Sequence, residues 1–316
     1  MQTLTLEKFY TELAKDPDLR RLGPYKLEGE VHGLVFPVDF NDGDGVEINL
    51  GAGDFSSKFA AFCNTKVKSI NFQHCKFADL YLDNLEAEQV DFSNVRANRI
   101  YFDYAKIVEN CRLGLLESDE IYFDKATIKT IFGNGSKAGN VHMDDLVAET
   151  FHVNTMEAGL IDFSQSTIGS LFVSRGSGIK KMDFARSKIE LMNLHEAKID
   201  EIRFGRSEIQ RALLNKASIG IVDCEDAEIN YLHIDQYENY IGDMNLSRAN
   251  IGELAIKKGP VERLYAGVEG DSLYKSLGEQ IEDPNQEYII IKNIKSGGLV
   301  DTENQKELRP PEIKMR

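Results

Sequence analysis

Nine carboxylates crowd one short part of this chain and could bind a positively charged partner. They are Glu190, Glu196, Asp200, Glu201, Glu208, Asp223, Glu225, Asp226 and Glu228. A dense set of acidic side chains attracts basic proteins and repels nucleic acid and anionic membranes. Basic residues interleave with these acids, so an ordinary solvated surface is the alternative interpretation. They are Arg186, Lys188, Lys198, Arg203, Arg206, Arg211 and Lys216. We predict an acidic binding face here.

A second cluster of carboxylates could ligate a hard cation such as Ca²⁺. Asp39, Asp42, Asp44 and Glu47 lie within Asp39–Asn49, and Ca²⁺ prefers such oxygen ligands. Their spacing is not that of an EF-hand loop, and Asp-Gly pairs are typical of hairpin turns. We therefore interpret the segment as a solvated hairpin turn and predict no metal site.

The glycine-rich segment Gly133–Gly139 has the composition of a phosphate-binding loop. It lacks the Gly-Lys-Ser/Thr ending, and no helical pattern follows it to offer an N-terminus to an anion. A flexible corner loop fits the segment better. We predict no nucleotide and no other cofactor.

No motif for catalysis stands out. The sequence contains neither a nucleophile elbow nor a His-Glu-x-x-His motif. Carboxylates are abundant, and a pair a few ångströms apart could cleave a polysaccharide. An enzyme acting on an extended polymer is therefore an alternative, but we predict that the protein is not an enzyme.

The acidic stretch is embedded in a five-residue apolar repeat. Every fifth residue from 184 to 234 is apolar: Phe184, Ile189, Leu194, Ile199, Phe204, Ile209, Leu214, Ile219, Cys224, Ile229 and Ile234. An apolar or small residue lies two places before each. A period of five is neither the 3.6 of a helix nor the 2 of a strand. A chain that turns every five residues can point all of these inward, so the pattern predicts a solenoid.

The repeat resembles the pentapeptide-repeat family, whose motif is a small residue, Asp or Asn, Leu or Phe, then two variable positions. The segments that carry this resemblance are Met182–Arg186, Val90–Asn94, Ile161–Gln165, Met192–Glu196, Val222–Asp226 and Ala249–Glu253. The resemblance implies an all-β fold, a right-handed four-sided β-helix with a wall of side chains inside. The chain departs from the motif, since the second position is often Lys, Arg, Glu or Tyr.

The repeat predicts where the β-helix begins, ends and slips. We expect an N-terminal capping segment of helix and hairpin at 1–47, the β-helix at 48–266, and a C-terminal helix, strand and mobile tail at 267–316. The frame slips by one residue near 108–120, where we expect an excursion, and by one residue near 174–181. It crosses the glycine-rich stretch near 133–140 and slips by two residues within Asp235–Asp243. Such slips are typical of loops at one corner of a coil.

The ends of a solenoid need covering because they expose unpaired strand edges. Leu6, Phe9, Tyr10 and Leu13 have helical spacing near the N-terminus. Near the C-terminus, Leu273, Leu277 and Ile281 share one side of a predicted helix, and Glu287–Ile294 is strongly β-prone. These three residues, together with Ile289 and Ile291, are our predicted homodimer contact.

The cysteines, the N-terminal residues and the distribution of apolar residues indicate the cellular compartment. The chain has 316 residues, a net charge of -15 and four cysteines. The cysteines lack a Cys-x-x-Cys pair, and Cys75 and Cys224 fall on inward positions, so we expect free thiols in a reducing compartment. The N-terminal residues lack a basic region followed by an apolar one, and no apolar run approaches the length of a membrane span. We expect a cytoplasmic protein.

We expect a non-catalytic solenoid that presents a rigid acidic face to a basic protein partner and binds neither nucleic acid nor membrane. The family resemblance implies an alternative, a DNA mimic that binds, inhibits or protects a type II topoisomerase.

Overall fold

The computed structural model describes residues 2–5, 8, 11, 12, 15, 25–28, 33–35, 47–50, 52–55, 59–235, 241–257, 261–265 and 288–295. The chain divides into two compact units, unit 1 (Met1–Asp162) and unit 2 (Phe163–Arg316). Both units are all-β, and both are parallel β-solenoids of stacked coils. The solenoid predicted from the five-residue repeat is confirmed.

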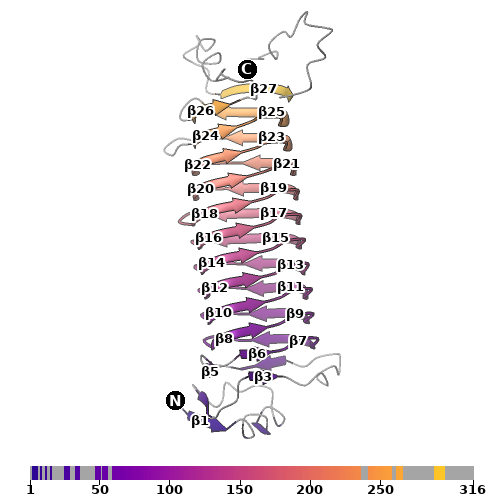
Figure 1. Ribbon diagram of the computed structural model, residues 1–316, viewed down its shortest axis with the longest axis vertical. Coiled ribbons are helices and arrows are strands. Elements are labelled where there is room, and N and C mark those ends of the chain that lie inside the picture. Colours follow the sequence, from indigo (N-terminus) through magenta and orange to yellow (C-terminus); the bar gives the residue numbers. More distant parts are fainter. Residues whose placement is uncertain are drawn as a thin grey trace, which may run out of the picture. The chain divides into compact units, whose positions relative to one another are not determined.

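In unit 1, successive coils place their strands in two sheets, 1A and 1B (Figure 1). Sheet 1A contains, in order, β1 (Gln2–Thr5), β2 (Tyr25–Glu28), β5 (Gly53–Phe55), β8 (Lys76–Tyr81), β10 (Arg96–Tyr101), β12 (Glu117–Tyr122), β14 (Lys137–His142) and β16 (Glu157–Asp162). The short strand β3 (Gly33–Val35) pairs with β6 (Phe59–Ala61), which pairs with β8. Sheet 1B contains β4 (Glu47–Asn49), β7 (Lys66–Asn71), β9 (Glu86–Asp91), β11 (Lys106–Arg112), β13 (Thr127–Phe132) and β15 (Val147–Asn154).

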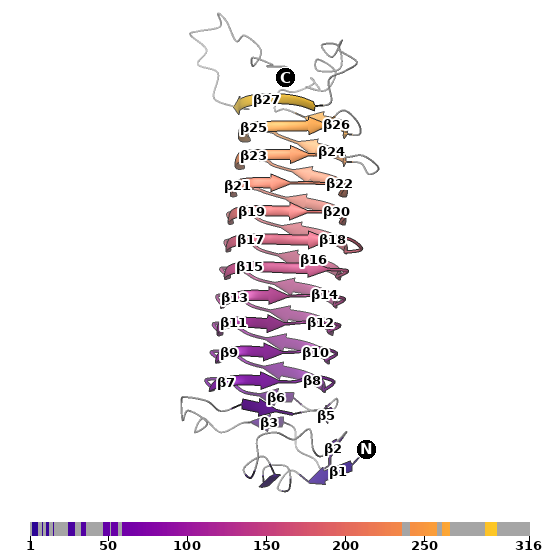
Figure 2. The ribbon, with the colours of Figure 1, turned by 180° about the vertical axis from the view of Figure 1, so that it is seen from behind.

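Unit 2 repeats this arrangement in sheets 2A and 2B, also seen from behind in Figure 2. Sheet 2A contains β18 (Gly178–Asp183), β20 (Lys198–Arg203), β22 (Ser218–Asp223), β24 (Ile241–Asn245) and β26 (Val261–Tyr265). Sheet 2B contains β17 (Thr167–Ser174), β19 (Lys188–Leu194), β21 (Glu208–Leu213), β23 (Glu228–Ile234), β25 (Asn250–Lys257) and β27 (Tyr288–Lys295). Among the described residues the last strand, β27, runs antiparallel to β25, so residues 288–294 of the predicted β-prone run are paired.

Tight turns make the coils possible. In the turn Leu82–Leu85, the N–H of Leu85 donates to the carbonyl of Leu82 at 3.0 Å, and Asn84 has a φ of 56°. A positive φ at the third position is the geometry of a type II turn. The same turn recurs about every ten residues, so equivalent positions such as Lys76 and Arg96 pair 20 residues apart.

The inward positions form the core that the repeat predicts. Phe184, Ile189, Leu194 and Ile199 are each at most 2% exposed. Phenylalanine rings fill the interior of unit 1, where the centroids of Phe102 and Phe123 lie 4.7 Å apart in a stacked pair. Burying such rings removes large apolar areas from water, the dominant favourable term in folding.

The structure explains the frame slips. In β11 the register shifts between Ile107 and Asn110, which is a β-bulge, and Cys111 and Leu113 already point inward again. The predicted excursion over 108–120 is therefore wrong, because a single extra residue is absorbed inside a strand. The slip near 174–181 is confirmed as one extra residue in the turn that contains Gly176, whose φ is 80°. After Asp235 the frame resumes at Ile241, and residues 236–240 lie outside the described part.

The glycine-rich segment forms a regular corner, not a separate loop. Gly133 occupies a buried inward position, Gly135 takes the left-handed turn position with a φ of 71°, and β14 begins at Lys137. The hydroxyl of Ser136 donates to the carbonyl of Leu113 in the neighbouring coil. The expected flexible loop is absent from this described segment because its residues follow the coil.

The two ends are described in part. Lys8, Thr11, Glu12 and Lys15 are helical, and the N–H of Lys8 donates to Oγ1 of Thr5 at 3.3 Å, as a helix N-cap does. Of the predicted hairpin turn Asp39–Asn49, residues 39–46 lie outside the described residues, and Glu47–Asn49 form β4, which pairs in parallel with β7. The predicted helix with Leu273, Leu277 and Ile281 also lies outside the described residues. Ile289 and Ile291 lie in β27 opposite Ile256 and Leu254 of β25. Their role in a homodimer stays a prediction.

Candidate functional site

The nine predicted acidic residues all lie in unit 2, but not on one face. Glu190 (β19), Glu208 (β21) and Glu228 (β23) belong to sheet 2B, whereas Asp200, Glu201 (both β20) and Asp223 (β22) belong to sheet 2A. Glu196 lies in the turn after β19, and Glu225 and Asp226 lie in the turn after β22. The repeat therefore distributes these carboxylates over two sheets and two turns.

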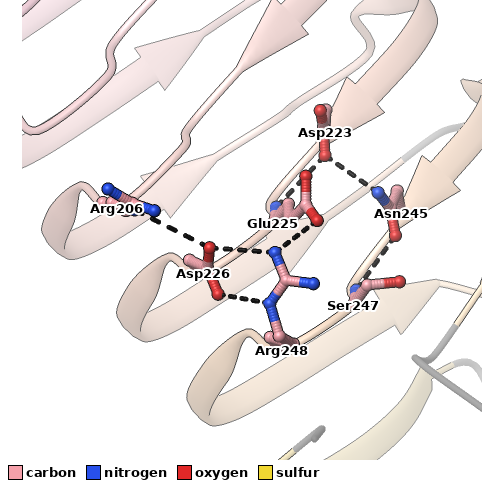
Figure 3. Close-up of polar contacts among 7 residues, drawn as sticks. All are labelled: Arg206, Asp223, Glu225, Asp226, Asn245, Ser247 and Arg248. Carbon is pink, nitrogen blue, oxygen red and sulfur yellow. Dashed lines mark hydrogen bonds and ion pairs between the residues drawn. The ribbon is translucent and has the colours of Figure 1, made fainter.

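Cations already occupy much of this acidic set. Arg248 binds the turn after β22: its Nε lies 2.6 Å from Oδ1 of Asp226 and its Nη2 lies 2.5 Å from Glu225 (Figure 3). Arg206 approaches Asp226 from another coil at 3.8 Å. The hydrogen bonds from Arg248 lower the pKa of Asp226. This turn is a neutralised network, not a free anionic surface.

Three other acids of the set have basic partners as well. Arg175 donates to Glu196 at 2.5 Å, Lys188 lies 2.9 Å from Glu208, and Arg203 contacts Glu201. Asp223 accepts hydrogen bonds from Asn245 at 3.0 Å and from the N–H of Glu225 at 3.1 Å. Glu190, Asp200 and Glu228 are exposed and make no ion pair among the described residues. Of the interleaved cations noted in the sequence, Lys188, Arg203, Arg206 and Lys216 pair with four of the nine acids, and Arg248 adds Glu225.

Unit 1 contains a more continuous acidic feature that sequence reasoning missed. An aromatic residue, a buried apolar residue and an aspartate recur once per coil: Tyr81-Leu82-Asp83, Tyr101-Phe102-Asp103, Tyr122-Phe123-Asp124 and His142-Met143-Asp144. We call these the Tyr-x-Asp ladder. The middle residues are buried in the core, which holds the two flanking side chains outward at the edge of sheet 1A. The signal in the sequence is the spacing of 20 or 21 residues.

The aromatic half of the ladder is a continuous stack. Ring centroids of Tyr81 and Tyr101, of Tyr101 and Tyr122, and of Tyr122 and His142 are each 4.8 Å apart, with interplanar angles of at most 9°. This spacing is that of hydrogen-bonded strands. His142 Nε2 also lies 3.0 Å from Glu120 Oε2. Strand register therefore fixes a rigid aromatic strip.

The acidic half consists of Asp83, Asp103, Asp124 and Asp144, all half-buried. The N–H of Asp103 donates to Asp83 Oδ1 at 3.2 Å, and the N–H of Asp144 donates to Asp124 Oδ1 at 3.0 Å. Desolvation raises the pKa of Asp83 and of Asp124. Desolvation, with Asp124 and Asp83 adding repulsion, raises the pKa of Asp103 to about 6. Oδ1 of Asp103 is buried without a hydrogen-bond partner among the described residues.

Cations contact aromatic rings at this edge of unit 1. The Arg99 guanidinium lies 6.0 Å from the centroid of Tyr101, and its Nη2 lies 2.6 Å from Asp79 Oδ2. The Lys125 ammonium lies 5.3 Å from the centroid of Tyr104 and donates to its hydroxyl at 3.2 Å. A cation near a ring face is attracted by the ring quadrupole. The edge therefore combines carboxylates and rings in a way that suits basic side chains.

The other sequence candidates are paired with a neighbour, buried, or outside the described residues. Glu47, in β4, pairs with Lys68 at 2.7 Å, and its companions Asp39, Asp42 and Asp44 lie outside the described residues. Cys75, Cys111 and Cys224 are buried, and burial raises the pKa of each thiol. Among the described residues, no group of three or more His, Cys, Asp or Glu is arranged to hold a metal ion.

A search of the described residues for a helix long and apolar enough to cross a membrane found none. No protein-family model, curated protein or solved structure matches the chain.

Proposed function

We propose that the protein is a non-catalytic binding solenoid whose acidic surface docks a basic segment of a partner protein. The observation that carries this proposal is the Tyr-x-Asp ladder, in which four carboxylates and four stacked rings repeat once per coil. The predicted face in unit 2 supports the proposal less, because five of its nine acids contact Arg or Lys.

The energetics suit a multivalent, salt-sensitive contact. A single exposed ion pair contributes only about 0.2–1 kcal/mol, and a cation on an aromatic face contributes about 0.5–1 kcal/mol at an exposed site. Several ladder residues that bind the partner at once give a measurable affinity, because the coil spacing fixes their positions before binding. Little conformational entropy of the solenoid is then lost on binding. Salt screens such contacts over about 10 Å at 0.1 M.

We further infer that the chain is a degenerate pentapeptide-repeat protein with four-sided coils. The six motif segments support this, because the first and third residue of each is at most 1% exposed, as in Met182 and Phe184. A DNA mimic acting on a type II topoisomerase is the second candidate. It requires an unbroken anionic face, and Arg203, Arg206 and Arg248 interrupt the acids of unit 2.

The test uses two fluorescein-labelled peptides, a decamer of lysine and a decamer of arginine. Each is titrated with the full chain, and binding is followed by fluorescence anisotropy. The ladder variant is Asp103→Asn/Asp124→Asn, and the matched control is Glu190→Gln/Glu228→Gln, which removes the same charge from sheet 2B. We expect the ladder variant to weaken binding about tenfold and the control less than threefold. Added salt should weaken binding to the natural chain.

Two outcomes contradict the proposal. Failure of both peptides to bind at about 20 mM salt would exclude a basic partner. Equal losses in the two variants would mean that net charge, and not the ladder, attracts the peptide. For the second candidate, the measurement is supercoiling by a bacterial type II topoisomerase, which a DNA mimic should inhibit.

A further inference from the structure

A polar groove crosses sheet 1B, separate from the Tyr-x-Asp ladder. It has a volume of about 270 Å³ and crosses the outer side of β4, β7, β9 and β11. Its polar lining residues are Glu47, Asn49, Ser69, Asn71, Gln89, Asp91, Asn110 and Arg112. The volume is just below the range of about 300–1,000 Å³ of sites that enclose drug-sized ligands. It suits one segment of a longer, linear molecule.

The charges in the groove are balanced by neighbours. Lys68 lies 2.7 Å from Glu47, and Gln89 Nε2 donates to Glu109 at 2.6 Å beside the groove. Asp91 Oδ2 accepts from Gln73 at 2.8 Å and lies 3.9 Å from Arg112. An ionic ligand would have to compete with these partners. The groove therefore favours a neutral ligand with many hydroxyl groups.

Backbone contacts fix the orientation of two polar side chains of the groove, Asn71 and Asp91. Oδ1 of Asn71 accepts from the N–H of Gln73 at 2.8 Å, and Oδ1 of Asp91 accepts from the N–H of Ser93 at 2.8 Å. Asn amides present both a donor and an acceptor, and a guanidinium presents several donors in a plane. Such planar groups can bind neighbouring hydroxyls in pairs. Preorganisation lowers the entropy lost when a ligand binds.

A β-bulge and an aromatic residue lie next to the groove residues of β11. The bulge of β11 lies between Ile107 and Asn110, immediately before the two groove residues Asn110 and Arg112. Bulges often re-aim side chains next to binding sites. In the next strand, β13, Phe132 lies opposite Arg112 and is half-buried, with its ring centroid 6.3 Å from that of His152. A partly exposed ring beside hydrogen-bonding side chains offers an apolar face for the C–H side of a sugar ring.

We propose that this groove binds a neutral oligosaccharide, with Asn71, Asn110 and Arg112 hydrogen-bonding to hydroxyls and Phe132 stacking on one ring. Each sugar hydroxyl is both donor and acceptor, which matches the mixed lining, and a linear chain matches a groove that crosses successive strands. The proposal is independent of the basic partner, since it uses the other sheet of unit 1. It assigns binding and no cleavage.

The experiment titrates the full chain with neutral tetrasaccharides, namely β-1,4-linked glucose, β-1,4-linked N-acetylglucosamine and α-1,4-linked glucose. Calorimetry gives the affinity, and saturation-transfer NMR shows which ring contacts the protein. The groove variants are Asn110→Ala and Arg112→Ala. Their matched controls on sheet 1A are Asn98→Ala and Arg96→Ala, since Arg96 is likewise exposed and paired with a carboxylate, Glu117, at 2.9 Å.

We expect at least one tetrasaccharide to bind, each groove variant to weaken it about tenfold, and each control to leave it within twofold. Because the ligand is neutral, raising salt from about 50 to 500 mM should not change the affinity. Thermal melts identify any variant that fails to fold, and Phe132→Leu then serves as a second groove variant. The proposal is overturned if no tetrasaccharide binds more tightly than about 10 mM, or if groove and control variants behave alike.

Discussion

The backbone N–H of Asp103 donates a hydrogen bond to Oδ1 of Asp83, one coil away, at 3.2 Å. This contact stacks two carboxylates that both lose hydration at the edge of sheet 1A. Desolvation, together with the charges of Asp124 and Asp83, raises the pKa of Asp103 to about 6. The ionised form of Asp103 therefore reduces the stability of the fold, and this carboxyl changes protonation near pH 6.

Asp103→Asn should make the protein more stable at neutral pH. The folded pKa of about 6 lies above the ordinary carboxyl value, so the folded state binds the proton more tightly than the unfolded state does. The stabilisation is present below pH 4 and is lost as pH rises through 6. At pH 7 the variant should gain about 1 kcal/mol, a value discounted because the carboxyl is partly exposed. Urea unfolding at pH 4, 5.5 and 7 measures this, and an equal gain at all three would contradict it.

Asp226→Asn should show the opposite pH dependence. Hydrogen bonds from Arg248 lower the pKa of Asp226. A carboxylate with a lowered pKa contributes stability above its unfolded pKa, and this contribution is lost as pH falls through the folded pKa. We expect the variant to be destabilised at pH 7 and to approach the natural chain as pH falls below 4. Thermal melts over the same pH series test the sign, which must differ from that of Asp103→Asn.

Gly133→Ala should stabilise unit 1, whereas Gly139→Ala should destabilise it. A Cβ on Gly133 would lie 3.6 Å from Val153 and 3.8 Å from Met156, which is ordinary apolar contact. Loss of chain entropy in the unfolded state then favours Ala by about 0.4–1 kcal/mol. A Cβ on Gly139 would lie 2.4 Å from the Asp119 carbonyl oxygen, and overpacking costs about 1–3 kcal/mol. Chemical denaturation measures the free energy of unfolding of both variants. A lower value for Gly133→Ala than for the natural chain would contradict the prediction that a Cβ fits at this position.

Leu115→Asn should stabilise the turn between β11 and β12. Leu115 has a φ of 55° and is 58% exposed. The left-handed region costs an ordinary L-residue about 1–2 kcal/mol, and Asn tolerates it better. We expect a gain of about 0.5–1 kcal/mol. The neighbouring Leu116→Asn is the control, since Leu116 is fully buried and the change there should be strongly destabilising.

Phe102→Ala should be among the most damaging single changes in unit 1. Phe102 is fully buried and stacks on Phe123 with ring centroids 4.7 Å apart. Truncating a buried Phe typically costs about 3–5 kcal/mol, because a cavity remains. The exposed neighbour Tyr104→Ala should change stability by less than about 0.5 kcal/mol. Similar melting temperatures for the two variants would show that the inward assignment is wrong.

The sequence alone determined the fold class and the identity of most core residues. Phe184, Ile189 and Leu194 could be assigned to the core because they recur at a fixed interval of five residues. Only a chain that turns at that interval can bury all of them together. The slip near Gly176 was visible for the same reason. Cys111 was missed, because one extra residue before it shifts the count and the sequence does not say whether a bulge or a loop absorbs it.

Only the tertiary structure decided which outward side chains meet. Neighbours on the surface come from successive coils, so Tyr101 and Tyr122, or Asp226 and Arg248, are 21 or 22 residues apart in the chain. A one-residue insertion changes every such pairing while leaving the apolar period intact. The raised pKa of Asp103 likewise depends on burial and on the charges stacked beside it. Coil register, which hydrogen bonds between strands set, is the physical reason why the acidic surface could not be read from the order of residues.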